Sequence, residues 1–127
     1  MFSHVMVGSN DIERSRTFYD ALFSAIGAEP GRSDDKGVNY IHNGAFFMVR
    51  KPLNGDTATH GNGSTIGFTV GSRDQVNAWH AAGVASGGTS VEDPPGIRQG
   101  TFTPLYLAYL RDPDGNKLCA LHRLPAE

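Results

Sequence analysis

The sequence AYLRDPDGNKLCALHR, residues 108–123, predicts a β-hairpin near the end of the chain. Two apolar segments flank DPDG, and proline, aspartate and glycine are residues that turns favour. The simplest register pairs Arg111 with Asn116, and it therefore places Tyr106 and Cys119 on the same face of the sheet. This hairpin closes a pattern of elements that the chain uses twice.

The region before the hairpin predicts a strand, a helix and another strand. Residues 64–71, STIGFTVG, alternate apolar with small or polar side chains, as a strand with one buried face does. Ser72 followed by Gln75 has the spacing of a helix capping box. The helix that follows has an inward stripe of Val76, Trp79, His80 and Gly83. GTSVED, residues 88–93, predicts a short strand that ends at a Pro-Pro-Gly break, after which residues 94–106 predict a long loop.

The first half of the chain has the same order of elements. A strand is expected over residues 3–8, and a helix follows with Asn10 as its cap and Glu13 at the capping-box position. Its apolar stripe is Ile12, Tyr19, Leu22, Phe23 and Ile26. Two more strands should flank the turn at Asn43-Gly44. The two capped helices begin about sixty residues apart, which indicates an internal duplication of a βαβββ unit.

These elements predict a single α+β domain over residues 1–127. The first module covers about residues 1–55 and the second about 64–127, and the polar, glycine-rich stretch 54–63 serves as their linker. The formal net charge is −2 and the 11 lysines and arginines are dispersed, which argues against nucleic acid or a membrane as partner. A single cysteine excludes an intrachain disulfide and favours a cytoplasmic location.

The combination of motifs resembles the vicinal oxygen chelate superfamily. The motifs are the HV dipeptide at residues 4–5, DIERSRTFYDALFSAIG at 11–27 and DPDGN at 112–116. This superfamily contains glyoxalase I, extradiol dioxygenases, fosfomycin resistance enzymes and bleomycin resistance proteins. The resemblance implies two tandem βαβββ modules that form a curled, cup-like mixed β-sheet with the helices outside. It also implies a homodimer and, in catalytic members, a divalent metal that acts as a Lewis acid.

The resemblance implies four metal-ligand positions, which fall at His4, Met48, Thr65 and Cys119 in this sequence. Only His4 and Cys119 carry donor atoms suited to a metal, and both are weak candidates. Two protein ligands are too few for the octahedral site of a glyoxalase-type enzyme. The sequence therefore argues against glyoxalase I activity, and a divalent metal is expected only if a dimer partner completes the site.

Six residues are candidates for a site. His4 is either a buried, hydrogen-bonded imidazole or an acid/base facing the pocket. Cys119 is either a small core residue or a pocket residue. Arg98 and Tyr106 belong to the predicted loop 94–106 and could cover the mouth of the cup, where Arg98 would meet an anionic group.

Thr65 and Phe47 complete the candidate set of ligand-binding residues. Thr65 lies on the small, polar side of its strand, and one of the neighbours Phe46 and Phe47 should face the helix while the other faces the cup. The sequence thus predicts a small-molecule-binding protein of glyoxalase-like fold, with lyase- or isomerase-type catalysis left open. The alternatives are a metal-dependent enzyme completed by a dimer partner and a sequestering protein of the bleomycin resistance type.

Overall fold

The computed structural model describes residues 1–125 and contains two helices and eight strands in that range. In the first half they are β1 (His4–Gly8), α1 (Ile12–Ser24), β2 (Arg32–Ser33), β3 (Gly37–His42) and β4 (Ala45–Arg50). In the second half they are β5 (Ile66–Thr69), α2 (Arg73–Ala85), β6 (Thr89–Gln99), β7 (Pro104–Arg111) and β8 (Lys117–Arg123). Neither helix is long and apolar enough to cross a membrane within these residues.

The strands form two four-stranded mixed sheets of the same topology. Sheet A has the order β1-β4-β3-β2 and sheet B has the order β5-β8-β7-β6. The pairs β1–β4 in sheet A and β5–β8 in sheet B are parallel, and the other neighbouring pairs are antiparallel. The predicted α+β fold with two βαβββ modules and outer helices is therefore confirmed. The two sheets do not join into one, because β1 and β5 are not hydrogen-bonded to each other.

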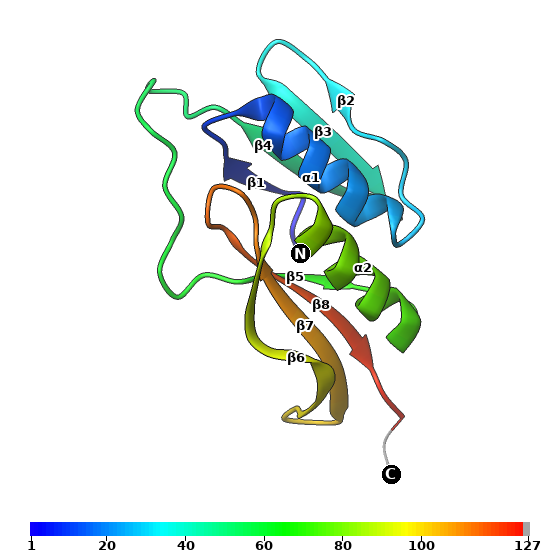
Figure 1. The fold of residues 1–127 in the computed structure, drawn as a ribbon. Helices are drawn as coiled ribbons and strands as arrows, with labels where there is room; N and C mark the ends of the chain where they lie inside the picture. The colour runs from blue at the N-terminus through cyan, green and yellow to red at the C-terminus, as the bar shows by residue number, and fades with distance from the viewer. Residues whose placement is uncertain (126–127) are drawn as a thin grey trace.

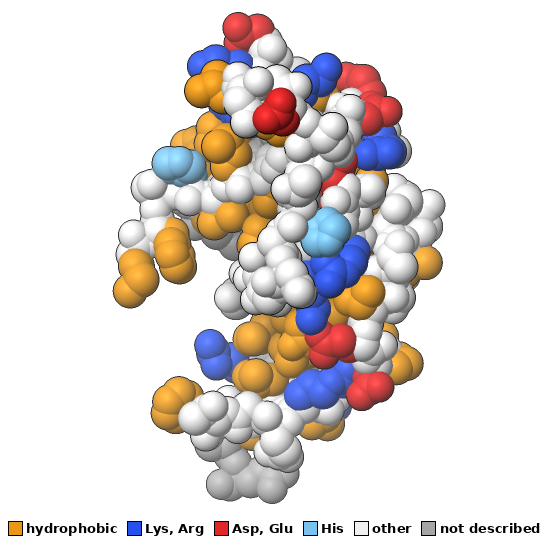
Figure 2. All heavy atoms as spheres, turned by 90° about the vertical axis from the view of Figure 1, so that its left-hand side faces the viewer, with side chains coloured by type: hydrophobic (Ala, Val, Ile, Leu, Met, Phe, Trp, Pro, Cys, Tyr) orange, Lys and Arg blue, Asp and Glu red, His pale blue; other side chains and the backbone are white. Residues whose placement is uncertain are grey.

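The helices and the sheets lie on different sides of the molecule. Helices α1 and α2 pack against each other on one side (Figure 1). The opposite side is hollowed between the two modules, and hydrophobic side chains gather on its walls (Figure 2). We call the sheet faces that turn away from the helices the outer faces. They correspond to the faces that were expected to line the cup.

One hydrophobic core lies under both helices and is shared by the two modules. The largest fully buried side chains include Trp79, Tyr19, Phe18 and Leu22. Both predicted helical stripes belong to this core or pack against it, apart from His80, which is hydrogen-bonded to Ser90. A shared core of this kind fixes the two helices against each other, because buried apolar side chains resist separation into water.

The capping prediction is correct for α2 and wrong by one residue for α1. The Ser72 side chain accepts a hydrogen bond from the Gln75 amide, as the capping box predicts. In α1 the cap is Asp11, which accepts from the Arg14 amide. The Asn10 side chain is hydrogen-bonded instead to the backbone of Ala58, at 2.7 and 3.1 Å, and so it ties down the segment that connects the modules.

The register predicted for the last hairpin is also wrong by one residue. Arg111 pairs with Lys117, and Cys119 lies opposite Tyr109. The DPDGN loop accounts for the shift, because the Asp112 amide donates to the Asn116 carbonyl and both residues thereby belong to the turn. Tyr106 consequently lies on the helix face of sheet B, whereas Cys119 lies on the outer face.

Strand β6 corrects a second prediction. It continues from Thr89 to Gln99 through Pro94 and Pro95, so that most of the expected loop is strand and only residues 100–103 connect β6 to β7. The register shifts between Val91 and Gly96, as it does at a β-bulge. Proline is tolerated there because β6 is the edge of its sheet and a bulge needs fewer ladder hydrogen bonds.

The DPDGN loop of the second module is hydrogen-bonded to the first half and the middle of α1 in the first module. The buried Asp112 carboxylate accepts from the Tyr19 hydroxyl at 2.5 Å. Asp114 accepts from the Arg14 guanidinium at 2.9 Å and from the Ser15 hydroxyl at 3.2 Å. Burial, with the Asp112 charge adding to it, raises the pKa of Tyr19, so its hydroxyl keeps the proton it donates. These contacts, here called the DPDGN clamp, fix the angle between the modules.

Candidate functional site

An apolar cleft lies where the modules meet on the side of β1 and β5. It has a volume of about 570 Å³ and is lined by the end of α1, parts of β3 and β4, strand β5 and the first residues of the chain. Its apolar lining includes Phe2, Phe23, Phe46, Phe47, Ile66 and Phe68. The cleft exists because β1 and β5, the facing edges of the two sheets, are not paired.

The adjacent residues Phe46 and Phe47 line the cleft from opposite faces of β4. Phe47 is buried and its ring lies 5.0 Å from that of Tyr19, on the helix face. Phe46 is 45% exposed and pairs with His4 on the outer face. The expected split of the two phenylalanines between helix and cup is confirmed, since neighbouring side chains on a strand point to opposite faces.

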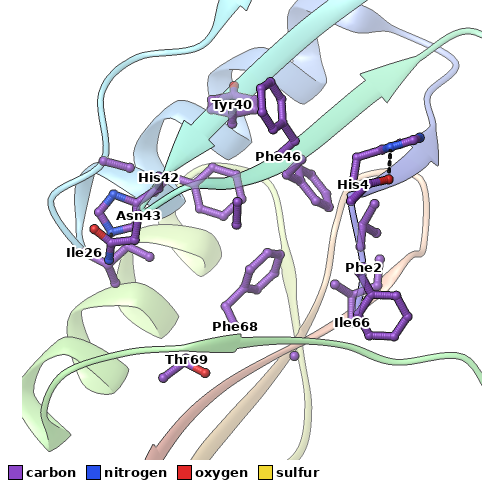
Figure 3. A pocket seen from close by; sticks show the side chains of 17 residues that line it. Phe2, His4, Ile26, Tyr40, His42, Asn43, Phe46, Ile66, Phe68 and Thr69 are labelled. Atoms are coloured by element: carbon purple, nitrogen blue, oxygen red, sulfur yellow. Dashed lines mark hydrogen bonds between the residues drawn. The ribbon is translucent and has the colours of Figure 1, made fainter.

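Phe68 on β5 forms the opposite wall. Its ring lies 5.2 Å from Phe23, 5.5 Å from Phe47 and 6.4 Å from Trp79, measured between ring centroids. Figure 3 shows Phe68 and Phe46 directed into the space between β4 and β5. Trp79 is the only tryptophan of the chain, so its fluorescence reports on this wall.

Polar side chains are placed at the two ends of the cleft. At one end His4 Nδ1 lies 2.7 Å from the Ser3 hydroxyl. At the other end His42 and Asn43, in the β3–β4 turn, are hydrogen-bonded through Nε2 and Nδ2 at 3.3 Å (Figure 3). The arrangement gives an apolar middle with hydrogen-bonding groups at each end, which is the usual make-up of a small-molecule pocket.

Two of the six candidate site residues, His4 and Phe47, line this cleft. Thr65 directly precedes the lining strand β5. Tyr106 lies on the helix face, where its hydroxyl donates to Asn77 at 2.9 Å and its ring faces Arg73. Tyr106 therefore does not share a face with Cys119, contrary to the predicted register.

Cys119 and Arg98 lie on the outer face of sheet B and are not part of the cleft lining. Cys119 is buried beside Tyr109. Burial raises the pKa of the Cys119 thiol to about 11, so the thiol is protonated at neutral pH and is a poor nucleophile. Arg98 pairs in register with Leu105 and donates to the carbonyls of Asp93 and Pro94.

The donor set of the described residues does not fit a glyoxalase-type metal. No three histidine, cysteine, aspartate or glutamate side chains in residues 1–125 lie close enough together to hold one ion. His4 has Phe46 as its register partner, and Cys119 has Tyr109 and Gly67 beside it. The only side-chain oxygen among these neighbours is the Tyr109 hydroxyl, whose raised pKa keeps it a neutral phenol, so a chelating set of oxygen and nitrogen ligands is not formed.

The sequence did not single out Phe68 and His42 as cleft residues. Phe68 belonged to the predicted core face of its strand, which it does occupy. His42 was placed in a turn, and only the folding of that turn beside α1 brings it to the cleft. The Asn43-Gly44 pair was the available signal, since both residues have positive φ, as a tight hairpin turn requires.

Comparison with known proteins agrees with this architecture. Residues 1–120 match the family model of the Glyoxalase/Bleomycin resistance protein/Dioxygenase superfamily. The chain belongs to this superfamily. The curated protein sequences gave no match.

Crystal structures of other superfamily members have the same fold. A glyoxalase/bleomycin resistance protein from Albidiferax ferrireducens T118 is 57% identical over 97% of this chain and 99% of its own, with a TM-score of 0.94. A glyoxalase/bleomycin resistance protein/dioxygenase family enzyme from Burkholderia phytofirmans PsJN is 17% identical, covers 96% and 98%, and has a TM-score of 0.73. A glyoxalase-related enzyme from Fulvimarina pelagi is 21% identical, covers 94% and 86%, and has a TM-score of 0.71. The last two similarities concern the fold alone.

Proposed function

We propose that this superfamily member binds a small apolar molecule containing an aromatic ring in the cleft between β4 and β5. The observation that carries the proposal is the phenylalanine-lined cleft, whose volume of about 570 Å³ falls within the range typical of ligand pockets. Phe46 and Phe68 offer ring faces and edges on opposite walls, and aromatic ligands pack favourably against both.

The ends of the cleft define what else the ligand should carry. His4 with Ser3, and His42 with Asn43, can each donate or accept a hydrogen bond. A polar substituent at one end of the ligand would exchange its bonds to water for bonds to one of these pairs. In this proposal His4 orients the ligand, and no proton transfer by His4 is required.

A homodimer is part of the same proposal. Met6 and Ile41 are large apolar side chains that are about half exposed on the outer face of sheet A. A second copy of the chain would remove such surface from water, which favours association. Sedimentation velocity at micromolar concentration should give a species of twice the chain mass, whereas a monomer at all concentrations would contradict this part.

The binding proposal is tested with the neutral fluorescent probe 1-aminoanthracene. We expect saturable binding, with energy transfer from Trp79 because that indole lies beside the Phe68 wall. Phe46→Ser should weaken binding about tenfold, since it removes one aromatic contact of roughly 1.4 kcal/mol.

Ile97→Ser is the matched control for that test. Ile97 is 52% exposed, similar to Phe46, and is not part of the cleft lining. It should leave the affinity for 1-aminoanthracene unchanged. Absence of saturable binding, or equal weakening by both substitutions, would contradict the cleft as the binding site.

A further inference from the structure

A cluster of charged and polar side chains lies on the outer face of sheet B, separate from the residues that line the cleft. Lys117 and Cys119 are two residues apart on β8 and therefore share this face, and Tyr109 is the register partner of Cys119 on β7. The Lys117 ammonium lies 4.9 Å from the centroid of the Tyr109 ring and forms an ion pair with Glu92. Polar groups of Lys117, Tyr109 and Glu92 thus lie together at one place on this face, beside Cys119.

Glu92 reaches this point at a cost in backbone conformation. Its φ is +59°, in the left-handed region that side chains other than glycine and asparagine rarely adopt. The β-bulge between Val91 and Gly96 produces this turn and directs the carboxylate towards Lys117. Strain of this kind persists only where surrounding contacts hold it, and it is found preferentially at functional sites.

Arg98 brings a second cation to the same face. Its guanidinium donates to the carbonyls of Asp93 and Pro94 at 3.1 and 3.0 Å, and no carboxylate within residues 1–125 forms an ion pair with it. Two backbone carbonyls therefore position Arg98 while leaving its charge uncompensated. The cluster holds two cations and only one carboxylate.

The Tyr109 hydroxyl completes the set as a neutral donor. Burial raises the pKa of Tyr109, and the neighbouring Cys119 and Glu92 raise it further. A protonated phenol can donate one hydrogen bond to an anion, which supplements the charge of the ammonium. The cluster thus combines an excess positive charge with a neutral hydrogen-bond donor.

We propose that this cluster is a binding site for the carboxylate of a small molecule, and that Glu92 occupies it when no ligand is bound. An incoming carboxylate would replace Glu92 on Lys117 and pair with Arg98, with the Tyr109 hydroxyl as an additional donor. Displacement would also let the backbone at Glu92 relax. The cluster borders the cleft, because Gly67 lines the cleft and is the neighbour of Cys119 on β5. The proposal does not depend on ligand binding in the cleft.

Calorimetric titration with benzoate at low ionic strength tests the carboxylate site. If Glu92 occupies the site, only a fraction of the molecules can bind benzoate. The apparent affinity for benzoate is then the intrinsic affinity multiplied by that fraction. Glu92→Gln should therefore bind benzoate about tenfold more tightly than the wild type, and Lys117→Met should lose binding. Benzyl alcohol, which has the same ring without the charge, should not bind to either variant at this site.

Glu29→Gln is the matched control, because it removes an exposed carboxylate from a residue outside this cluster. It should leave the benzoate affinity unchanged. Amide chemical shifts of Tyr109 and Cys119 should move on titration of Glu92→Gln, which locates the binding. Arg98→Gln should weaken benzoate binding independently, so the test does not rest on whether Lys117→Met folds. Equal affinities in Glu92→Gln, Glu29→Gln and wild type, or no binding by any of them, would overturn the proposal.

Discussion

The two sides of the junction between the modules differ in how they are packed. On the helix side, α1 and α2 meet over a shared core, and the DPDGN clamp bonds the second module to α1. On the strand side, β1 and β5 are unpaired and the space between the sheets is a cleft. The same junction between the modules therefore contains a packed contact on the helix side and a cleft on the strand side.

This difference separates stability from binding. In the clamp, Asp112, Tyr19 and Ser15 are buried and hydrogen-bonded, so their substitution should destabilise the fold. Phe46, on the open side, is half exposed and should contribute little to stability while contributing to the cleft wall. The aromatic cluster around Phe68 lies between the two sides and contributes to both.

The strongest test of the packed side is Asp112→Ala. It removes the acceptor of the buried Tyr19 hydroxyl and of the Asn116 side chain. Leaving such groups unsatisfied should lower the free energy of unfolding by about 3 kcal/mol. Urea denaturation measures the change, and Asp35→Ala, at an exposed aspartate, should have almost no effect. A loss below about 1 kcal/mol would show that the clamp does not hold the modules together.

A smaller effect is expected from Gly83→Ala, in the contact of α2 with the core. The added Cβ would lie 2.3 Å from Leu110 Cδ1 and 3.1 Å from Leu22 Cδ1. Overpacking should outweigh the better helix propensity of alanine and cost about 1 kcal/mol net. Thermal unfolding of Gly83→Ala, Leu110→Val and the double variant should reveal coupling, because the shorter valine leaves room for the new methyl group. Purely additive effects would exclude this close contact as the cause.

The smallest stability effect is expected for Phe46→Ser on the open side. Because the ring is 45% exposed, the free energy of unfolding should change by no more than about 0.5 kcal/mol. The same variant should bind 1-aminoanthracene more weakly, so that urea denaturation and probe binding respond differently. A stability loss as large as that of Asp112→Ala would mean that the cleft wall is part of the structural core.

Local sequence patterns predicted most of the fold. The Ser72 cap, the apolar stripes of the helices, the Asn43-Gly44 turn and the alternation in β5 are all found in the structure. Each depends on residues within one turn or one strand, where spacing alone fixes which side chains meet. The family resemblance rested on these elements and on their repetition, which is why it extended over nearly the whole chain.

The site was predicted less completely, because it depends on contacts between distant segments. The bonds of Asp112 within the DPDGN loop shift the hairpin register by one residue and so separate Tyr106 from Cys119. The edge position of β6 allows a strand to continue through Pro94 and Pro95. The bulge between Val91 and Gly96 interrupts its ladder, and Glu92 within the bulge forms an ion pair with Lys117. The sequence by itself determined the two modules and their inward faces through local spacing. Only the tertiary structure decided that β1 and β5 remain apart, because the clamp and the helix contact fix the angle between the modules and leave the cleft between them.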